Sequence, residues 1–219
     1  ASRKNWTQKL FFTIGIREKF KHVWQSSLGI YVSGSGILGF AKELVSALVQ
    51  EALPANILNE QDFERRFIVP IASRIIIRHP RVSLYTHPFS SRICCAPECS
   101  DDSGDNVRRV IGCPKCWAAS KSWASVAAFG THHTFDMAAR DQNNTLALEL
   151  KLAAVRGGRM PNGKIQRFLG QCLLAGTKHS VVIGVLCYRG KLQDKWHSDT
   201  SRVIRSLKNQ NVCLVFRDA

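Results

Sequence analysis

The sequence predicts a mixed α/β fold in which a β-hairpin is embedded in a partly parallel sheet. Three observations support this prediction. Residues 145–152 alternate strictly between leucine and other residues, as in a strand. Residues 164–175 repeat apolar side chains at helical spacing, and residues 180–187 are continuously apolar, as in a buried strand. A strand, a helix and a second strand in that order are typical of parallel pairing.

The composition bounds the class of protein. The chain has 219 residues, of which 45% are hydrophobic, enough for one domain with a small appendage. No apolar run approaches the roughly 18–20 residues that cross a bilayer. The apolar stretch 10–14 near the basic start is too short for a signal peptide. We therefore expect a soluble, cytoplasmic protein without a membrane partner.

The charge balance indicates the partner. The chain carries 31 Lys and Arg against 16 Asp and Glu, which gives a formal net charge of +15. An excess of this size repels itself and is typical of proteins that bind a polyanion. Nucleic acid is the favoured partner, ahead of an anionic membrane surface. A basic surface that serves only solubility is the alternative.

Residues 1–56 are predicted to form an N-terminal helical region. Helices are expected at 6–24 and 37–53, and Pro54 ends the second. Between them, residues 34–39 match the pattern G-x-G-x-x-G. This pattern indicates a dinucleotide site only between a strand and a helix, within a strand–helix–strand unit. We interpret it as a turn that leads into the second helix.

The next elements are a helix, a strand and a mixed segment. Asn59 is a suitable N-cap, and Asp62 supplies the acidic residue that the first turn favours. Apolar residues then recur at helical spacing, at Phe63, Phe67, Ile68, Ile71 and Ile75. Pro70 should kink this helix or stop it early. Residues 81–87 are expected to form a strand, and residues 117–129 a helical or mixed segment.

The best-patterned region is the hairpin. Residues 133–140 are expected to form one strand, residues 141–144 a turn, and residues 145–152 a second strand. Side chains alternate between the two faces of a strand. The leucines of the second strand therefore point to the core, and Glu149 and Lys151 share the other face.

The register of this hairpin brings two carboxylates together. With a four-residue turn, pairing outward from its flanks places Asp136 directly opposite Glu149. Cross-strand Cβ atoms lie roughly 4.5–5.5 Å apart, so the two carboxylates repel unless a cation lies between them. A hard divalent ion such as Mg²⁺ takes oxygen ligands. Lys151, on the same face, could orient or deprotonate a water or stabilise a developing negative charge.

The alternative is a solvated hairpin with a charged outer face. Directly opposed like charges destabilise a hairpin, which argues against it. The flanking residues on the same face, Ala138 and Ala147, are small and apolar, which is unusual for a solvated strand face. The pattern therefore favours a functional site.

These residues carry a family resemblance. Phe135-Asp136, the turn, and Leu148-Glu149-Leu150-Lys151 resemble the D…(D/E)-x-K signature of the PD-(D/E)XK nuclease superfamily, with Phe135 in place of the leading Pro. The element order over residues 57–219 also resembles the restriction-endonuclease-like αβββαβ core of that family. The resemblance implies a Mg²⁺- or Mn²⁺-dependent endonuclease. It would hydrolyse phosphodiester bonds, with DNA as the expected substrate, in a defence, restriction or repair setting.

The resemblance also implies further site residues. Many members carry an acidic residue on the helix before the first strand, and Glu64 is the first candidate here, with Glu60 second. The alternative is a surface glutamate paired with Arg65. Some members use a glutamine on the helix after the lysine strand, which Gln171 or Gln166 would match. An ordinary polar helix residue is the alternative.

The helix at residues 164–175 has two predicted sides. Its apolar face comprises Ile165, Phe168, Leu169, Cys172 and Leu173, and Gln171 lies on the other side. Four basic residues in and before this helix are expected to contact backbone phosphates: Arg156, Arg159, Lys164 and Arg167. A final helix at 201–209 and a final strand at 212–216 complete the chain.

The cysteines predict a structural zinc site. Five of the eight lie between residues 94 and 116, and the other three stand alone in apolar surroundings. The four expected ligands are Cys95, Cys99, Cys113 and Cys116, with Cys94 as an alternative to Cys95. Four thiolates close a tetrahedral shell, which excludes catalysis at this metal; a disulfide or free thiols are the alternatives. A zinc-ribbon-like insert at 90–120 follows, with Arg108 and Arg109 as nucleic-acid contacts.

The sequence leaves two functional hypotheses. The main one is the metal-dependent nuclease, with Asp136, Glu149 and Lys151 at its centre. Its rival is a non-catalytic zinc-ribbon protein that binds nucleic acid on a nuclease scaffold. His132 and His133 adjoin the hairpin and are interpreted as polar or substrate-contacting residues rather than metal ligands. Assembly into a homodimer or a larger complex is left open.

Overall fold

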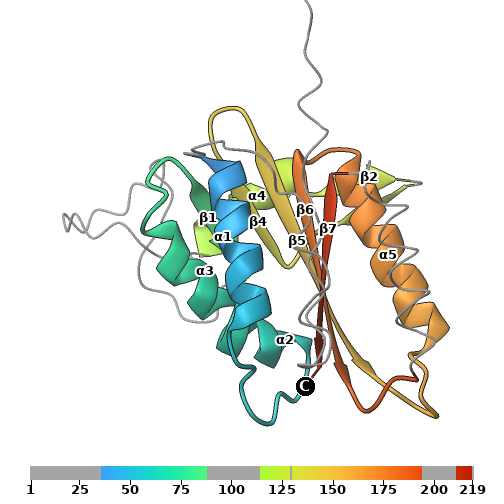
Figure 1. Cartoon of the computed structure of the whole chain (residues 1–219). Helices are drawn as coiled ribbons and strands as arrows, with labels where there is room; N and C mark the ends of the chain where they lie inside the picture. Colours follow the sequence, from blue (N-terminus) through green and yellow to red (C-terminus); the bar gives the residue numbers. More distant parts are fainter. Residues whose placement is uncertain (1–35, 88–113, 129, 194–210, 219) are drawn as a thin grey trace, which may run out of the picture.

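The computed structural model describes residues 36–87, 114–128, 130–193 and 211–218 (Figure 1). A five-stranded mixed sheet lies at its centre, in the order β1-β4-β5-β6-β7. The strands are β1 (Ser83–Thr86), β4 (Met137–Arg140), β5 (Thr145–Ala154), β6 (Val181–Arg189) and β7 (Val212–Asp218). β1, β4 and β5 pair antiparallel, whereas β5, β6 and β7 pair parallel. The predicted α/β class with a hairpin in a partly parallel sheet is confirmed.

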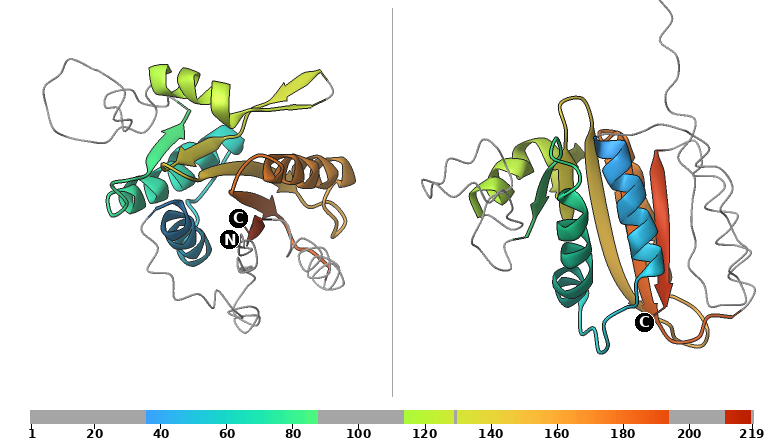
Figure 2. Two further views of the ribbon diagram at one scale, coloured as in Figure 1. Left: turned by 90° about the horizontal axis from the view of Figure 1, so that it is seen from above. Right: turned by 60° about the vertical axis from the view of Figure 1, so that its left-hand side comes forward.

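One face of the sheet is covered by a helical layer. It contains α1 (Ile37–Gln50), α2 (Glu60–Phe63), the π-helical turn η3 (Glu64–Ile68) and α3 (Val69–Ile76) (Figure 2). The three leucines of β5 that face this layer are fully enclosed, at Leu146, Leu148 and Leu150. The alternating leucines therefore form the core face, as predicted.

The other face is covered by α5 (Asn162–Gly176) and, over β1, by α4 (Pro114–Ala124) with the small sheet of β2 (Val126–Ala128) and β3 (Thr131–His133). Phe168 and Cys172 of α5 pack on β6 and β7. A Cβ at Gly184 of β6 would lie 2.6 Å from the Cys172 sulfur, so this glycine lets the helix approach closely. With both faces covered, β6 is buried almost throughout.

The helix that opens at Asn59 differs from the prediction at Pro70. The Asn59 side chain accepts the Asp62 N–H at 2.8 Å, which confirms the N-cap. The early stop at Pro70 is wrong, because the helix runs through it to Ile76. The distortion instead takes the form of the wider π turn at Glu64–Ile68, immediately upstream. Proline has no N–H to complete a regular helical hydrogen bond, and π turns are frequent at functional sites.

The single strand predicted at 133–140 is wrong, because it is two strands. β3 ends at His133 and belongs to the small sheet, the chain bends at Asp136, and β4 begins at Met137. The predicted register is confirmed up to the pair Met137↔Leu148, one pair short of Asp136 and Glu149. The ladder ends there because the Asp136 carboxylate accepts the Leu150 N–H at 2.7 Å.

Smaller differences concern helix ends and faces. α1 ends at Gln50 rather than residue 53, because Glu51 adopts an extended backbone. Leu173 is 40% exposed, so its assignment to the apolar face of α5 is wrong. Gly36 has a φ of 117° at the start of α1, where a turn into the helix was predicted. The helices predicted at 6–24 and 201–209 lie outside the described residues.

No helix in the described part of the chain combines the length and apolarity that a bilayer crossing requires.

Candidate metal centre

The candidate site lies where β4 and β5 separate. β5 continues past the end of β4, and two carboxylates take the place of the missing strand. Asp136 Oδ2 accepts the Leu150 N–H at 2.7 Å, and Glu60 Oε1 accepts the Leu152 N–H at 3.2 Å. Successive N–H groups along one edge of a strand are two residues apart. The open edge of β5 is therefore lined with acidic side chains.

Three neighbouring strands bring one residue each to this point. The β1–β4 ladder ends at Thr86↔Met137, so the next pair in register would be His87 and Asp136. The β4–β5 ladder ends at Met137↔Leu148, so the next pair would be Asp136 and Glu149. His87, Asp136 and Glu149 thus follow one another across the sheet, immediately beyond its last paired residues.

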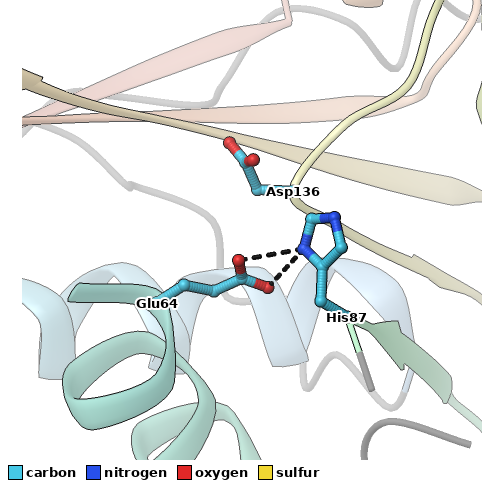
Figure 3. Close-up of side chains that lie close together, drawn as sticks. All are labelled: Glu64, His87 and Asp136. Carbon is cyan, nitrogen blue, oxygen red and sulfur yellow. Dashed lines mark hydrogen bonds and ion pairs between the residues drawn. The ribbon is translucent and has the colours of Figure 1, made fainter. Parts of the chain in front are cut away.

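Glu64, His87 and Asp136 form a compact triad (Figure 3). His87 Nδ1 lies 2.9 Å and 3.0 Å from the two carboxylate oxygens of Glu64. One donor atom from each of the three residues lies within 4.8 Å of the other two, close enough for all three to hold one metal ion. Glu64 is only 3% exposed and lies at the site, so the alternative of a surface glutamate paired with Arg65 is wrong.

The two carboxyl groups of the triad have raised pKa values. Burial raises the pKa of Asp136 to about 7, with the negative charges of Glu149 and Glu64 adding to the effect. Burial also raises the pKa of Glu64, and its hydrogen bond to His87 offsets part of that rise. The same hydrogen bond raises the pKa of His87. A bound cation would relieve the repulsion between these carboxylates.

Glu149 and Lys151 lie beside the triad and contact each other. Glu149 is 2% exposed, and its Oε1 lies 3.4 Å from Lys151 Nζ. Lys151 Nζ lies at the same distance from Glu60 Oε2. Burial alone would lower the pKa of Lys151, but the charges of Glu149, Glu60 and Asp136 outweigh it and raise that pKa. The lysine is therefore held as an ammonium ion among carboxylates.

Gln171 reaches the site through His133. The Gln171 amide nitrogen lies 3.3 Å from His133 Nδ1, and His133 Nε2 lies 3.1 Å from Glu149 Oε2. The Gln171 Oε1 is enclosed and has no hydrogen-bond partner among the described residues. Gln171 is therefore half-buried and joined to Glu149 through His133, whereas Gln166 is exposed.

The predicted phosphate-binding residues in the described region are exposed: Arg156, Arg159, Lys164 and Arg167. Lys164 Nζ donates to the Leu152 carbonyl at 3.0 Å, which places it next to Lys151. Arg156 and Arg159 flank the turn that follows β5. The basic residues therefore begin where the acidic edge of β5 ends.

The zinc prediction lies outside the described residues. This applies to Cys94, Cys95, Cys99 and Cys113, and to the expected nucleic-acid contacts Arg108 and Arg109. Cys116 lies in the first turn of α4, where side chains are not described. The structural zinc site and its contact role stay predictions.

Sequence reasoning missed His87 as a site residue. It lies 49 positions before Asp136, on the far side of the cysteine-rich segment. Local periodicity placed His87 at the end of a strand but could not give the register of that strand against β4. The signal that could have found it is the antiparallel continuation of the sheet, in which the residue after β1 faces the residue before β4.

Comparisons with protein-family models, with curated proteins and with solved structures gave no match to this chain. The function is therefore inferred from the site.

Proposed function

We propose that this chain is a metal-dependent nuclease with a restriction-endonuclease-like core. It hydrolyses phosphodiester bonds, and DNA is favoured over RNA as its substrate. One observation carries the proposal. Asp136, at the bend before β4, converges with Glu149 and Lys151 of β5 and with Glu64 of the helical layer at the open edge of β5.

A purely structural role explains this cluster poorly. Glu64 and Glu149 are almost completely buried, and Asp136 is half-buried between them. Burying like charges together destabilises the folded protein unless opposite charges and hydrogen bonds compensate. Lys151 provides one positive charge near these groups. The remaining negative charge favours a divalent cation with oxygen ligands, which is Mg²⁺ or Mn²⁺.

The order of the elements supports the family assignment. The helix at 60–76, then β1, β4, β5, α5 and β6 follow the αβββαβ order of the PD-(D/E)XK core. The cysteine-rich insert lies between β1 and β4, and β7 extends the sheet at its parallel edge. This order brings the helix, the hairpin and the glutamine of α5 to the same place.

The mechanism follows from where the charges lie. Glu64, Asp136 and Glu149 are the residues that would hold the ion. When bound, a divalent ion polarises the scissile phosphate and lowers the pKa of a water. The raised pKa of Lys151 keeps its ammonium protonated at neutral pH, which favours electrostatic stabilisation of the pentavalent phosphate over proton abstraction.

The basic residues of α5 suit a nucleic-acid substrate. Lys164, beside Lys151, would contact a phosphate adjoining the scissile one, and Arg167 one turn further along α5 would contact the next part of the backbone. The net charge of +15 supplies the long-range attraction.

The test is cleavage by the purified full chain. Single- and double-stranded DNA and RNA are incubated with Mg²⁺, Mn²⁺ or a chelator, beside the variants Glu149→Gln and Lys151→Ala. We expect metal-dependent cleavage of DNA that falls roughly 1,000-fold in either variant. Glu43→Gln is the matched control, because Glu43 is a glutamate of α1 whose partners Arg78 and His79 lie outside the site.

Salt-sensitive binding to all these nucleic acids without cleavage of any would contradict the proposal. It would favour the non-catalytic zinc-ribbon protein instead. Cleavage that survives in Glu149→Gln would remove this site from the reaction.

A further inference from the structure

We propose that Glu64, His87 and Asp136 bind a divalent first-row transition-metal ion of the Mn²⁺ type, and that the His87 imidazole makes the site prefer this ion to Mg²⁺ and Ca²⁺. The inference rests on the proposed function in that it names the metal of the same site. Its physical content, a nitrogen ligand beside two carboxylates, can be measured without any cleavage reaction.

The geometry places a nitrogen donor where the acidic residues alone would leave an all-oxygen site. His87 Nδ1 lies 2.9 Å from Glu64 Oε2, and the donor atoms of the triad lie within 4.8 Å of one another. Figure 3 shows the imidazole beside the Glu64 carboxylate and the Asp136 side chain above both. An ion that Glu64 and Asp136 share would therefore have the imidazole within reach.

The His87 ring is held in place by packing. Its centroid lies 4.4 Å from that of Trp117, with the two rings tilted by 51°. Trp117 lies on α4 and is 8% exposed. Contact with a large enclosed ring restricts the rotamers that His87 can adopt. A ligand that is held in place loses less conformational entropy when it coordinates an ion.

The donor set determines the class of metal. Mg²⁺ takes oxygen ligands in near-ideal octahedral geometry and keeps several of its waters. Imidazole suits first-row transition metals, whereas carboxylates suit Mg²⁺, Ca²⁺ and Mn²⁺. Mn²⁺ accepts both types of donor. Two carboxylates and one imidazole therefore favour Mn²⁺ over ions that prefer oxygen alone.

Glu149 lies beside the triad and makes contacts of its own. Its Oε2 contacts His133 and its Oε1 contacts Lys151. The triad comes from η3, the end of β1 and the bend before β4. Replacing His87 should therefore change the choice of metal while Glu149 and Lys151 keep their contacts.

The test uses the spectrum of bound Mn²⁺. The full chain is freed of divalent ions other than tightly bound zinc and is then loaded with Mn²⁺. Pulsed electron paramagnetic resonance detects ¹⁴N coupling when an imidazole nitrogen coordinates the ion. We expect ¹⁴N coupling in the wild type, its loss in His87→Asn, and its retention in His132→Asn, which removes an exposed histidine of β3.

A second measurement covers the case in which His87→Asn does not fold. Incorporation of ¹⁵N-histidine into the wild type should replace the ¹⁴N signal by that of ¹⁵N, which shows without any substitution that the ligand is a histidine. His87→Asp restores an all-oxygen site. In that variant the ratio of the Mg²⁺ to the Mn²⁺ dissociation constant should fall at least roughly tenfold from its wild-type value.

Any of the following results would overturn the inference: no histidine coupling in the wild type, coupling that survives in His87→Asn, or an unchanged ratio in His87→Asp. Absence of Mn²⁺ binding would overturn it as well. Histidine coupling without cleavage of any nucleic acid would uphold the metal site and contradict only the nuclease function.

Discussion

Two aspartates at opposite ends of β4 differ in what surrounds them. Asp141, at the turn of the hairpin, accepts backbone N–H groups from Ile37 at 2.8 Å, Asn143 at 2.9 Å and Asn144 at 2.7 Å. Asp136, at the open end, accepts one backbone N–H and lies close to Glu149 and Glu64. Asp141 joins the turn to the start of α1.

The pKa values of the two carboxyl groups are consequently shifted in opposite directions. Burial alone would raise the pKa of Asp141, but the hydrogen bonds from Ile37, Asn143 and Asn144 outweigh it and lower that pKa. Burial and neighbouring carboxylates raise the pKa of Asp136 to about 7. Hydrogen-bond donors around a carboxylate indicate a structural role, and uncompensated like charges indicate a binding site.

The largest expected effect is on catalysis. Asp136→Asn should reduce metal-dependent DNA cleavage roughly 1,000-fold or more, because an amide replaces a charged ligand. Asp141→Asn should stay within about threefold of the wild type at a temperature where both are folded. Initial rates of cleavage measure both variants. A large loss in Asp141→Asn with intact folding would break the distinction between the two aspartates.

The second effect is on stabilisation by metal. Mn²⁺ at 100 times its dissociation constant should add about 2.7 kcal/mol to the free energy of unfolding, which is about 5–10 °C in Tm for a chain of this size. Asp136→Asn should show little of this shift, and Asp141→Asn should show all of it. Thermal unfolding with and without Mn²⁺ measures the Tm shift of each variant. Equal shifts in the two variants would place the ion elsewhere.

The third effect is on stability without metal. Asp141→Asn leaves one acceptor oxygen for N–H groups that now bond to two, and its amide cannot accept them. We expect a loss of about 1–3 kcal/mol in the free energy of unfolding. Urea unfolding of the metal-free protein measures it. Unchanged stability would mean that water satisfies these groups.

The smallest effect is the dependence of metal-free stability on pH. The lowered pKa of Asp141 stabilises the fold above the unfolded pKa of about 3.9, and this stabilisation is lost as pH falls through the folded value. The raised pKa of Asp136 has the opposite sign. Its contribution is full below about 3.9 and is lost as pH rises to about 7.

Asp136→Asn should therefore raise the Tm of the metal-free protein by a few degrees at pH 8 but not at pH 4. Asp141→Asn should lower the Tm at pH 8 and do so less below pH 4. If Asp136→Asn destabilised the protein at pH 8, the Asp136 carboxylate would be a structural group like that of Asp141.

Local patterns predicted the hairpin well. The turn at 141–144 and the alternation of β5 gave the register in which Arg140 faces Thr145, and the structure has that register. Period-2 alternation operates within one strand, and a short turn fixes how two adjacent strands align. The sequence therefore identified Glu149 and Lys151 as neighbours on one face of β5.

The bend at Asp136 could not be predicted in this way. Residues 133–140 have the composition of a continuous strand, yet the chain leaves the sheet where the Asp136 carboxylate bonds to the Leu150 N–H. Competition between a side chain and a backbone ladder depends on burial and on neighbouring charges, which a local pattern does not contain.

The sequence by itself determined the α/β class, the hairpin and its register, and the acidic pair beside a lysine, because all of these arise from residues close together in the chain. Tertiary structure decided which distant residues complete the site. It brought His87 to Asp136 through the antiparallel pairing of β1 with β4, and it turned Glu64 inward on the π turn of the helical layer. Such contacts depend on the docking of elements far apart in the chain, and for that reason only the folded structure reveals the complete triad.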